Sequence, residues 1–356
     1  MISKNRVKNT FNREKSDRVP VNYLCNPGID EKLKAHFDLR ADDSEGLRRA
    51  LGVDIRGVSA GYIGPPLHEQ MPERCVDPCW GWHTRLVEHA TGSYWDFCDF
   101  PLKNAGEDEI ANWPMPSPDD YDYDSLPNQC AEFREYGLHV GDAGLGCVMN
   151  TAGFFRSMDQ IFIDLALEDP GGLLLMDRFL AIQLEKTERE LDNIGHLVDF
   201  MWLGEDLGTQ RSPMISMEMF KSQILPRHKP FIELAKSYNL PVMIHTCGSS
   251  SWTYEEYIAA GITCFDTLQP EAKDMAPEHL ASRFGDRASF HGCISTTNEL
   301  AFGTVADVER HVQHTLEVMM PYRGYFLSPA HQIQDNSPVE NVLEMYRAGS
   351  AFGQYR

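Results

Sequence analysis

From about residue 130 onward, short apolar segments alternate with longer segments in which apolar residues recur every three or four positions. The short segments have the length and composition of buried strands, and the longer ones have the spacing of amphipathic helices. Regular alternation of this kind predicts βα units around a parallel sheet. The strands predicted in this part of the chain cover residues 138–143, 198–203, 241–246, 263–267, 288–292 and 324–328.

Two further strands are predicted nearer the N-terminus, at residues 21–24 and 53–58, behind an amphipathic helix at residues 3–16. With them the chain has about eight βα repeats, which predicts a (β/α)8 TIM barrel with an N-terminal extension. An open, doubly wound α/β sheet is the alternative. We interpret residues 1–356 as a single barrel domain.

Residues 65–125 interrupt the pattern, because Pro, Trp and acidic residues dominate there. We interpret this stretch as an insertion that forms a lid over the barrel or flanks it. Within it, residues 82–88 and 92–97 predict a β-hairpin.

Helices are predicted between the strands, and two of them carry local signals. The helix at residues 216–239 contains Pro226, which predicts a break. The last helix, at residues 338–348, follows Ser337, with Glu340 three residues later, and this spacing predicts an N-terminal capping box. The other predicted helices cover residues 29–37, 44–51, 157–168, 172–194, 252–260, 276–284 and 304–319.

The formal net charge of −21 argues against binding to nucleic acid or to an anionic membrane, since both need basic surfaces. Nine cysteines stand at irregular spacings, an odd number without a disulfide framework, which indicates reduced thiols and a cytoplasmic protein. No apolar run is long enough to span a membrane. These features favour a cytoplasmic protein with a small-molecule substrate.

Metal-binding residue types gather where the predicted strands end. His245 and Cys247 follow one strand at alternate positions, so their side chains point the same way. An imidazole and a thiolate are preferred zinc ligands, although an isolated His-x-Cys is more often an ordinary strand end. In a parallel barrel, all strands end at the same face. His331, after the last strand, therefore completes a predicted three-ligand zinc site.

Other polar residues are predicted at the same face. Glu205 and Asp206 follow the strand at residues 198–203, where either could fill the fourth zinc position or act as a catalytic proton carrier. Gln269 and His291 are predicted at the rim of the pocket. A zinc ion in such a site either activates a bound thiol or activates water, and the ligands alone favour neither.

Four segments, in this order along nearly the whole chain, resemble the uroporphyrinogen decarboxylase superfamily. They are Arg13–Val21 (REKSDRVPV), Gly204–Gln210 (GEDLGTQ), His245–Gly248 (HTCG) and Leu327–His331 (LSPAH) with the following Pro338–Asn341 (PVEN). The resemblance implies a (β/α)8 barrel and is compatible with a homodimer. True decarboxylases of this superfamily carry an Arg-rich segment after the first strand, which is absent here.

The other branch of the superfamily contains corrinoid-dependent methyltransferases, which bind zinc through His-x-Cys and a distant Cys. His245 and Cys247 match the first two ligands, and His331 stands where the distant Cys is expected. Because true decarboxylases also have a His near this point, His331 could instead face the substrate. The resemblance implies a zinc-dependent methyltransferase that uses a corrinoid (cobalamin), carried on a partner protein. The alternatives are a decarboxylase or other lyase acting on a smaller acid, and a non-catalytic corrinoid-binding module.

Overall fold

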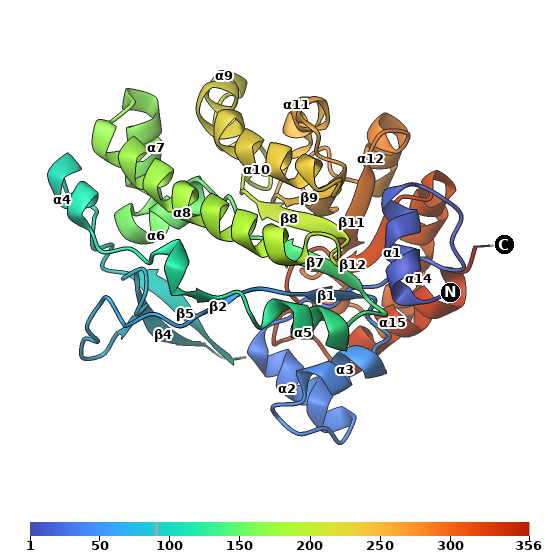
Figure 1. Ribbon diagram of the computed structural model, residues 1–356. Helices are drawn as coiled ribbons and strands as arrows, with labels where there is room; N and C mark the ends of the chain where they lie inside the picture. The colour runs from blue at the N-terminus through green and yellow to red at the C-terminus, as the bar shows by residue number, and fades with distance from the viewer. Residues whose placement is uncertain (90–91, 356) are drawn as a thin grey trace.

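The computed structural model describes residues 1–89 and 92–355 and shows a curled parallel sheet of seven strands (Figure 1). Neighbouring strands follow one another along the chain, apart from the strands of the insertion. This architecture confirms the α/β class and is consistent with a TIM-like barrel. The strands are β1 (Ile55–Gly57), β7 (Gly137–Gly141), β8 (Phe200–Gly204), β9 (Val242–His245), β10 (Cys264–Thr267), β11 (Ser289–Ile294) and β12 (Tyr325–Pro329).

The space between β12 and β1 is occupied by residues 20–26, which form no regular strand. Val21 makes a single parallel bridge to Leu327 of β12, and its carbonyl oxygen accepts a hydrogen bond of 2.9 Å from the N–H of Asp54. The regular strand predicted at residues 21–24 is therefore wrong. Pro20 has no N–H to donate to a ladder, and the next bridge occurs only at Cys25. The segment nonetheless lies in the position of an eighth strand.

The helices that follow the strands cover the outer face of the sheet, and α8 is the longest of them (Figure 1). The helices are α1 (Ser3–Phe11), α2 (Pro27–His36), α3 (Ser44–Ala50), α4 (Glu107–Asn112), α5 (Leu126–Glu132), α6 (Met149–Arg156), α7 (Met158–Leu167), α8 (Pro170–Ile194), α9 (Met217–Met219), α10 (Leu225–Ser237), α11 (Tyr254–Ala260), α12 (Pro277–Phe284), α13 (Glu299–Phe302), α14 (Val305–Met319) and α15 (Val339–Phe352). Among the described residues, no helix is both long and apolar enough to cross a membrane.

Helix α1 packs against the amino-terminal end of the sheet. The ring of Phe11 lies 4.9 Å from that of Phe200 and 5.0 Å from that of Phe326, measured between centroids. Val7, one turn earlier, is fully buried. The predicted helix at residues 3–16 is thus confirmed in a shorter form, and it fills this end of the sheet with apolar side chains.

Two helix termini differ from the prediction. The break near Pro226 is present as a π-helical turn, Phe220–Ile224, directly before α10. The predicted capping box before the last helix is wrong. Pro338 occupies the N-cap position of α15, and the buried hydroxyl of Ser337 has no hydrogen-bond partner.

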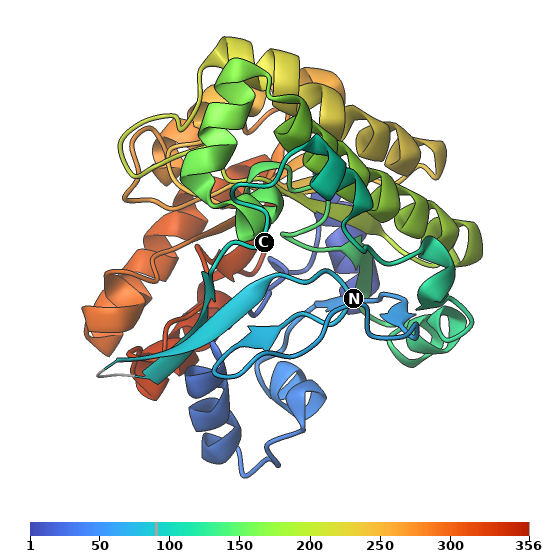
Figure 2. The same cartoon turned by 90° about the vertical axis from the view of Figure 1, so that its left-hand side faces the viewer.

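Two small antiparallel sheets lie in and next to the predicted insertion, and one of them contains the expected hairpin of β4 (His83–His89) and β5 (Gly92–Cys98) (Figure 2). Residues 90–91, between the two strands in the sequence, lie outside the described residues. β3 (Cys75–Val76) extends this hairpin, and β2 (Gly61–Tyr62) pairs with β6 (Tyr121–Asp122). The ring of Phe97 on β5 stacks on Phe154 of α6 at 3.6 Å between centroids, so the hairpin is packed onto the main body.

Candidate metal centre

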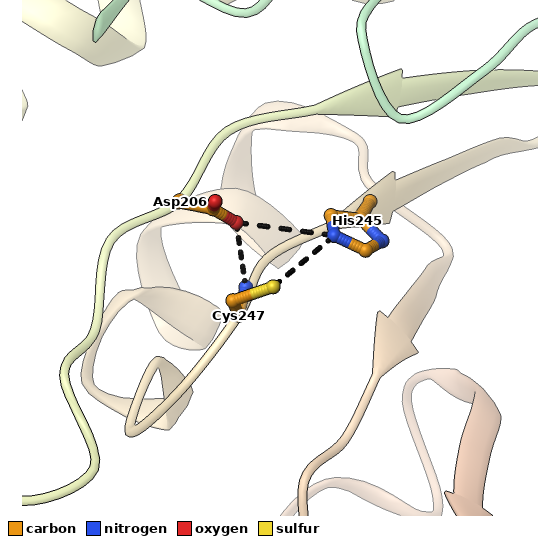
Figure 3. Close-up of side chains that lie close together, drawn as sticks. All are labelled: Asp206, His245 and Cys247. Carbon is orange, nitrogen blue, oxygen red and sulfur yellow. Dashed lines mark hydrogen bonds and ion pairs between the residues drawn. The ribbon is translucent and has the colours of Figure 1, made fainter. Parts of the chain in front are cut away.

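Three side chains with metal-binding atoms meet at the carboxyl ends of β8 and β9 (Figure 3). One ligand atom from each of Asp206, His245 and Cys247 lies within 4.8 Å of the other two. The Nε2 atom of His245 is 3.3 Å from the Cys247 Sγ and 3.8 Å from the Asp206 Oδ1. Ligands around one tetrahedral zinc ion are about 3.3–3.8 Å apart, given bonds of about 2.0–2.3 Å. The three residues therefore fit a zinc ion in both chemistry and spacing.

The local sequence explains how Cys247 returns toward His245. In the strand Val242–His245 the first three residues are buried and His245 is partly exposed; Gly248 then adopts a φ of +66°, in the left-handed region that glycine adopts without strain. A Cβ on Gly248 would lie 2.1 Å from the carbonyl oxygen of Gly208, so this close backbone approach requires glycine. The turn is further fixed by Gln269, whose Oε1 accepts a 2.7 Å hydrogen bond from the Gly248 N–H.

Asp206 is held in place by two hydrogen bonds. The backbone N–H of Cys247 donates to its Oδ1 at 3.1 Å, and the side-chain amide of Asn150, on α6, donates to its Oδ2 at 2.7 Å. Burial raises the pKa of Asp206, but the neighbouring His245 and these hydrogen bonds outweigh burial and lower it. The carboxylate is thus ionised and directed at the imidazole.

A buried carboxylate orients His245. The register of the sheet places His245, Asp266 and His291 side by side on β9, β10 and β11. One Asp266 oxygen lies 2.7 Å from the His245 Nδ1, and the other lies 2.5 Å from the His291 Nδ1. Asp266 therefore accepts from Nδ1 of His245 and leaves Nε2 facing Cys247 and Asp206. Metal-binding histidines commonly have such a carboxylate behind them.

The hydrogen-bonded chain continues across the sheet to the irregular N-terminal segment. The side-chain amide of Asn22 lies 3.0 Å from the Nε2 atom of His291. His291 is fully buried, so it lies behind the site rather than at the predicted rim. The Thr267 hydroxyl also lies close to His245, 2.6 Å from its Nδ1, and Thr267 has a φ of +87°. Positive φ is strained for a β-branched residue, and such strain is concentrated at functional sites.

The pKa shifts show that this site favours positive charge. Burial lowers the pKa of His245, but hydrogen bonds to Asp266 and Cys247 raise it well above its usual value. Burial raises the pKa of Asp266, yet the two imidazoles hold it well below its usual range. A bound metal cation in place of the His245 proton would satisfy the same carboxylates.

Glu205, the neighbour of Asp206, points away from the three-residue group. Its carboxylate is buried and accepts hydrogen bonds from the backbone N–H groups of Val148 (2.7 Å) and Met149 (3.3 Å), at the start of α6. Burial raises its pKa to about 8, although these N–H groups lower it. Of the two predicted carboxylates, only Asp206 reaches the metal-binding group, and Glu205 instead anchors a helix terminus.

His331 is close to the group but not a member of it. Its ring centroid lies 6.3 Å from that of His245, whereas two imidazoles on one tetrahedral zinc ion would be about 5 Å apart. The ring is half-buried, and burial together with the charge of His245 lowers its pKa, so it is neutral. His331 and His245 both line a cavity of about 810 Å³ at the mouth of the sheet.

Sequence reasoning missed three residues that shape this site. The pattern predicts Asp266 and Asn22 only as parts of strands and gives Asn150 no role. The available signal was an acidic residue at an inward position of an otherwise apolar strand, Cys264–Thr267. A buried carboxylate in such a strand needs cationic or hydrogen-bonding partners, and here two histidines provide them.

Comparison with known proteins agrees with the resemblance drawn from the sequence. Residues 206–352 match the family model of uroporphyrinogen decarboxylase (URO-D), and this segment includes Asp206, His245, Cys247 and His331. The segment that contains the candidate metal centre therefore has the sequence pattern of the URO-D superfamily.

Among solved structures, a methyltransferase from Methanosarcina mazei is similar over 99% of both chains, with a TM-score of 0.62 and 15% sequence identity. At this identity the similarity establishes a shared fold. A comparison with curated protein sequences finds no significant relative.

Proposed function

We propose that this protein is a zinc-dependent methyltransferase that moves a methyl group between a corrinoid cofactor and an acceptor bound at the metal. The observation that carries the proposal is the convergence of Asp206, His245 and Cys247, within 4.8 Å of one another. The URO-D match and the methyltransferase fold neighbour support the enzyme class. The corrinoid and its carrier protein come from the family resemblance.

The roles of the residues follow from their contacts. Asp206, His245 and Cys247 would hold the ion, and Asp266 would keep the Nε2 of His245 directed toward it. A zinc ion here would lower the pKa of an acceptor group such as a thiol. His331, neutral and on the cavity wall, would contact either the fourth metal position or the bound acceptor.

A decarboxylase acting on a small acid is less well supported by the cavity. Two arginines line it, Arg48 and Arg56. Arg56 is neutralised by Glu45, with 2.7 Å between the Nε and Oε2 atoms. Arg48 has no ion pair among the described residues, so one guanidinium is available for a substrate carboxylate. A polycarboxylate would need several.

The test is the metal content of the purified protein, combined with zinc-edge X-ray absorption and methyl transfer from methylcobalamin to thiol acceptors. We expect about one zinc per chain, with one sulfur ligand. Cys247→Ala and Asp206→Ala should lose the metal, whereas His331→Ala separates two roles. Loss of zinc in His331→Ala would identify a ligand, and retained zinc with reduced transfer would identify a substrate contact. A zinc-free protein that transfers methyl groups at full rate in a chelator would overturn the proposal.

A further inference from the structure

A second cavity, of about 290 Å³, lies where the insertion meets the main body. We call it the aromatic chamber, because five aromatic side chains line it. Two come from the loop before β4, one from β6, one from α6 and one from α8: Trp80, Trp82, Tyr121, Phe154 and Phe179.

The rings surround the chamber rather than filling it. The planes of Trp80 and Trp82 are within 6° of parallel, with centroids 6.3 Å apart. Phe179 lies 4.4 Å from Trp80, and Phe154 lies 5.8 Å from Trp82 and nearly perpendicular to it. Of the five residues Phe179 is buried, and the other four keep part of their surface exposed.

The charges on the chamber wall leave one carboxylate free. The Lys186 ammonium pairs with Glu190 at 2.6 Å and lies 5.2 Å from the centre of the Tyr121 ring. Asp142 is exposed, accepts one hydrogen bond of 2.7 Å from the Gly144 N–H, and has no ion pair among residues 1–89 and 92–355. Of the charged residues that line the chamber, Asp142 is therefore the one without an oppositely charged partner in the described part of the chain.

We propose that the aromatic chamber is a binding site for a small organic cation of the methylated ammonium type. Aromatic faces attract such cations through the ring quadrupole, and the apolar methyl groups are buried against the same rings. The position of Lys186 over Tyr121 shows that this wall already holds one cation. An anion would be repelled by Asp142, and a neutral planar molecule would leave the charge of Asp142 without an ion pair. Asp142 also lines the cavity beside His245, so the bound cation would lie next to that cavity.

The experiment is calorimetric titration of the full-length protein with tetramethylammonium and with choline. The neutral isostere 3,3-dimethyl-1-butanol, which has the shape of choline without its charge, serves as the matched ligand. We expect saturable binding of the cations and about tenfold weaker binding of the isostere, since cation–π attraction and one carboxylate contribute together.

Two variants locate the site. Asp142→Asn keeps an oxygen for the Gly144 N–H and should weaken choline binding by about two- to fivefold without affecting the isostere. Trp80→Leu should weaken choline binding by about two- to thirtyfold. Trp95→Leu, which removes an exposed tryptophan of β5 outside the chamber, should have no effect.

The outcomes decide the proposal independently of the metal centre, because Cys247→Ala should bind choline like the wild type. Absence of saturable binding by both cations would overturn the proposal, as would equal affinity for choline and its isostere. Unchanged choline affinity in both Asp142→Asn and Trp80→Leu would overturn the placement in this chamber.

Discussion

Asp266→Asn tests whether the Asp266 carboxylate, by accepting from Nδ1 of His245, keeps Nε2 of His245 free to bind a metal. In the wild type, the two oxygens of Asp266 accept from the Nδ1 atoms of His245 and His291. Asparagine keeps one acceptor and replaces the other by an NH2 donor. One of the two imidazoles must therefore lose its partner or change its tautomer. If His245 changes, its Nε2 carries a proton and no longer binds a metal.

The magnitude follows from this loss. Removal of a partner hydrogen-bonded to a metal-binding histidine typically reduces metal affinity by about 10- to 100-fold, which is roughly 1.4–2.7 kcal/mol. The assay is competition for zinc between the protein and a chromophoric chelator at neutral pH. Asp42→Asn is the matched control, since it removes one negative charge from the wall of the same cavity, where Asp42 pairs with Arg40.

We expect Asp42→Asn to keep wild-type zinc affinity. If Asp266→Asn bound zinc as tightly as the wild type, while Cys247→Ala lost the metal, the orienting role assigned to Asp266 would be refuted. Circular dichroism of the metal-free variants would establish that both fold.

Three further predictions concern stability and local geometry. Ser337→Ala should leave the free energy of unfolding unchanged or raise it slightly, because the Ser337 hydroxyl has no hydrogen-bond partner. Thr304→Ala should lower the free energy of unfolding by about 0.5–2 kcal/mol, measured with denaturant, because the Thr304 side chain caps α14. Equal losses in the two variants would contradict the N-cap positions assigned to α14 and α15. Burial lowers the pKa of His228 to about 4, so between about pH 6.5 and pH 4 the unfolded chain takes up a proton that the folded chain does not, and stability falls as the pH falls. His228→Gln should therefore reduce the slope of the unfolding free energy against pH by up to about 1.4 kcal/mol per pH unit. An unchanged slope would contradict a neutral buried imidazole. Gly248→Ala should lower both zinc affinity and melting temperature, because its Cβ would clash with the backbone of Gly208. Gly52→Ala is the control, since Gly52 also has a positive φ but no atom within 4 Å of the added Cβ, and it should lower the free energy of unfolding by only about 1 kcal/mol and keep the metal. Similar effects of the two substitutions would show that the tight turn at Gly248 is not needed.

The apolar segments of the second half predicted the sheet because a buried parallel strand has a simple requirement, a short run of apolar residues. The same reasoning failed at residues 21–24, where Pro20 and the long-range contacts of Val21 decide the conformation. It also missed helix α6, whose sequence Met149–Arg156 includes Asn, Thr and Gly, residues that favour other conformations. The start of α6 is stabilised by Glu205, 56 residues away, which no local pattern can reveal.

The candidate metal centre was predictable to the extent that it lies at strand ends. His245, Cys247 and Asp206 follow β9 and β8, and parallel strands bring their ends to one face. Which residues come within bonding distance depends on side-chain direction, and this separates Asp206 from Glu205. The assignment of His331 as a ligand stays a prediction.

Helix α6 contacts a candidate metal ligand and its neighbour Glu205 near its beginning, and the hairpin near its end. Its first N–H groups are bound by Glu205, its Asn150 holds Asp206, and its Phe154 stacks on Phe97 of the hairpin. Because Glu205 and Asp206 are adjacent in the chain and both are hydrogen-bonded to α6, a shift of this helix would also displace the carboxylate of a candidate metal ligand. A displacement of the hairpin would therefore reach the candidate metal ligands through this one helix.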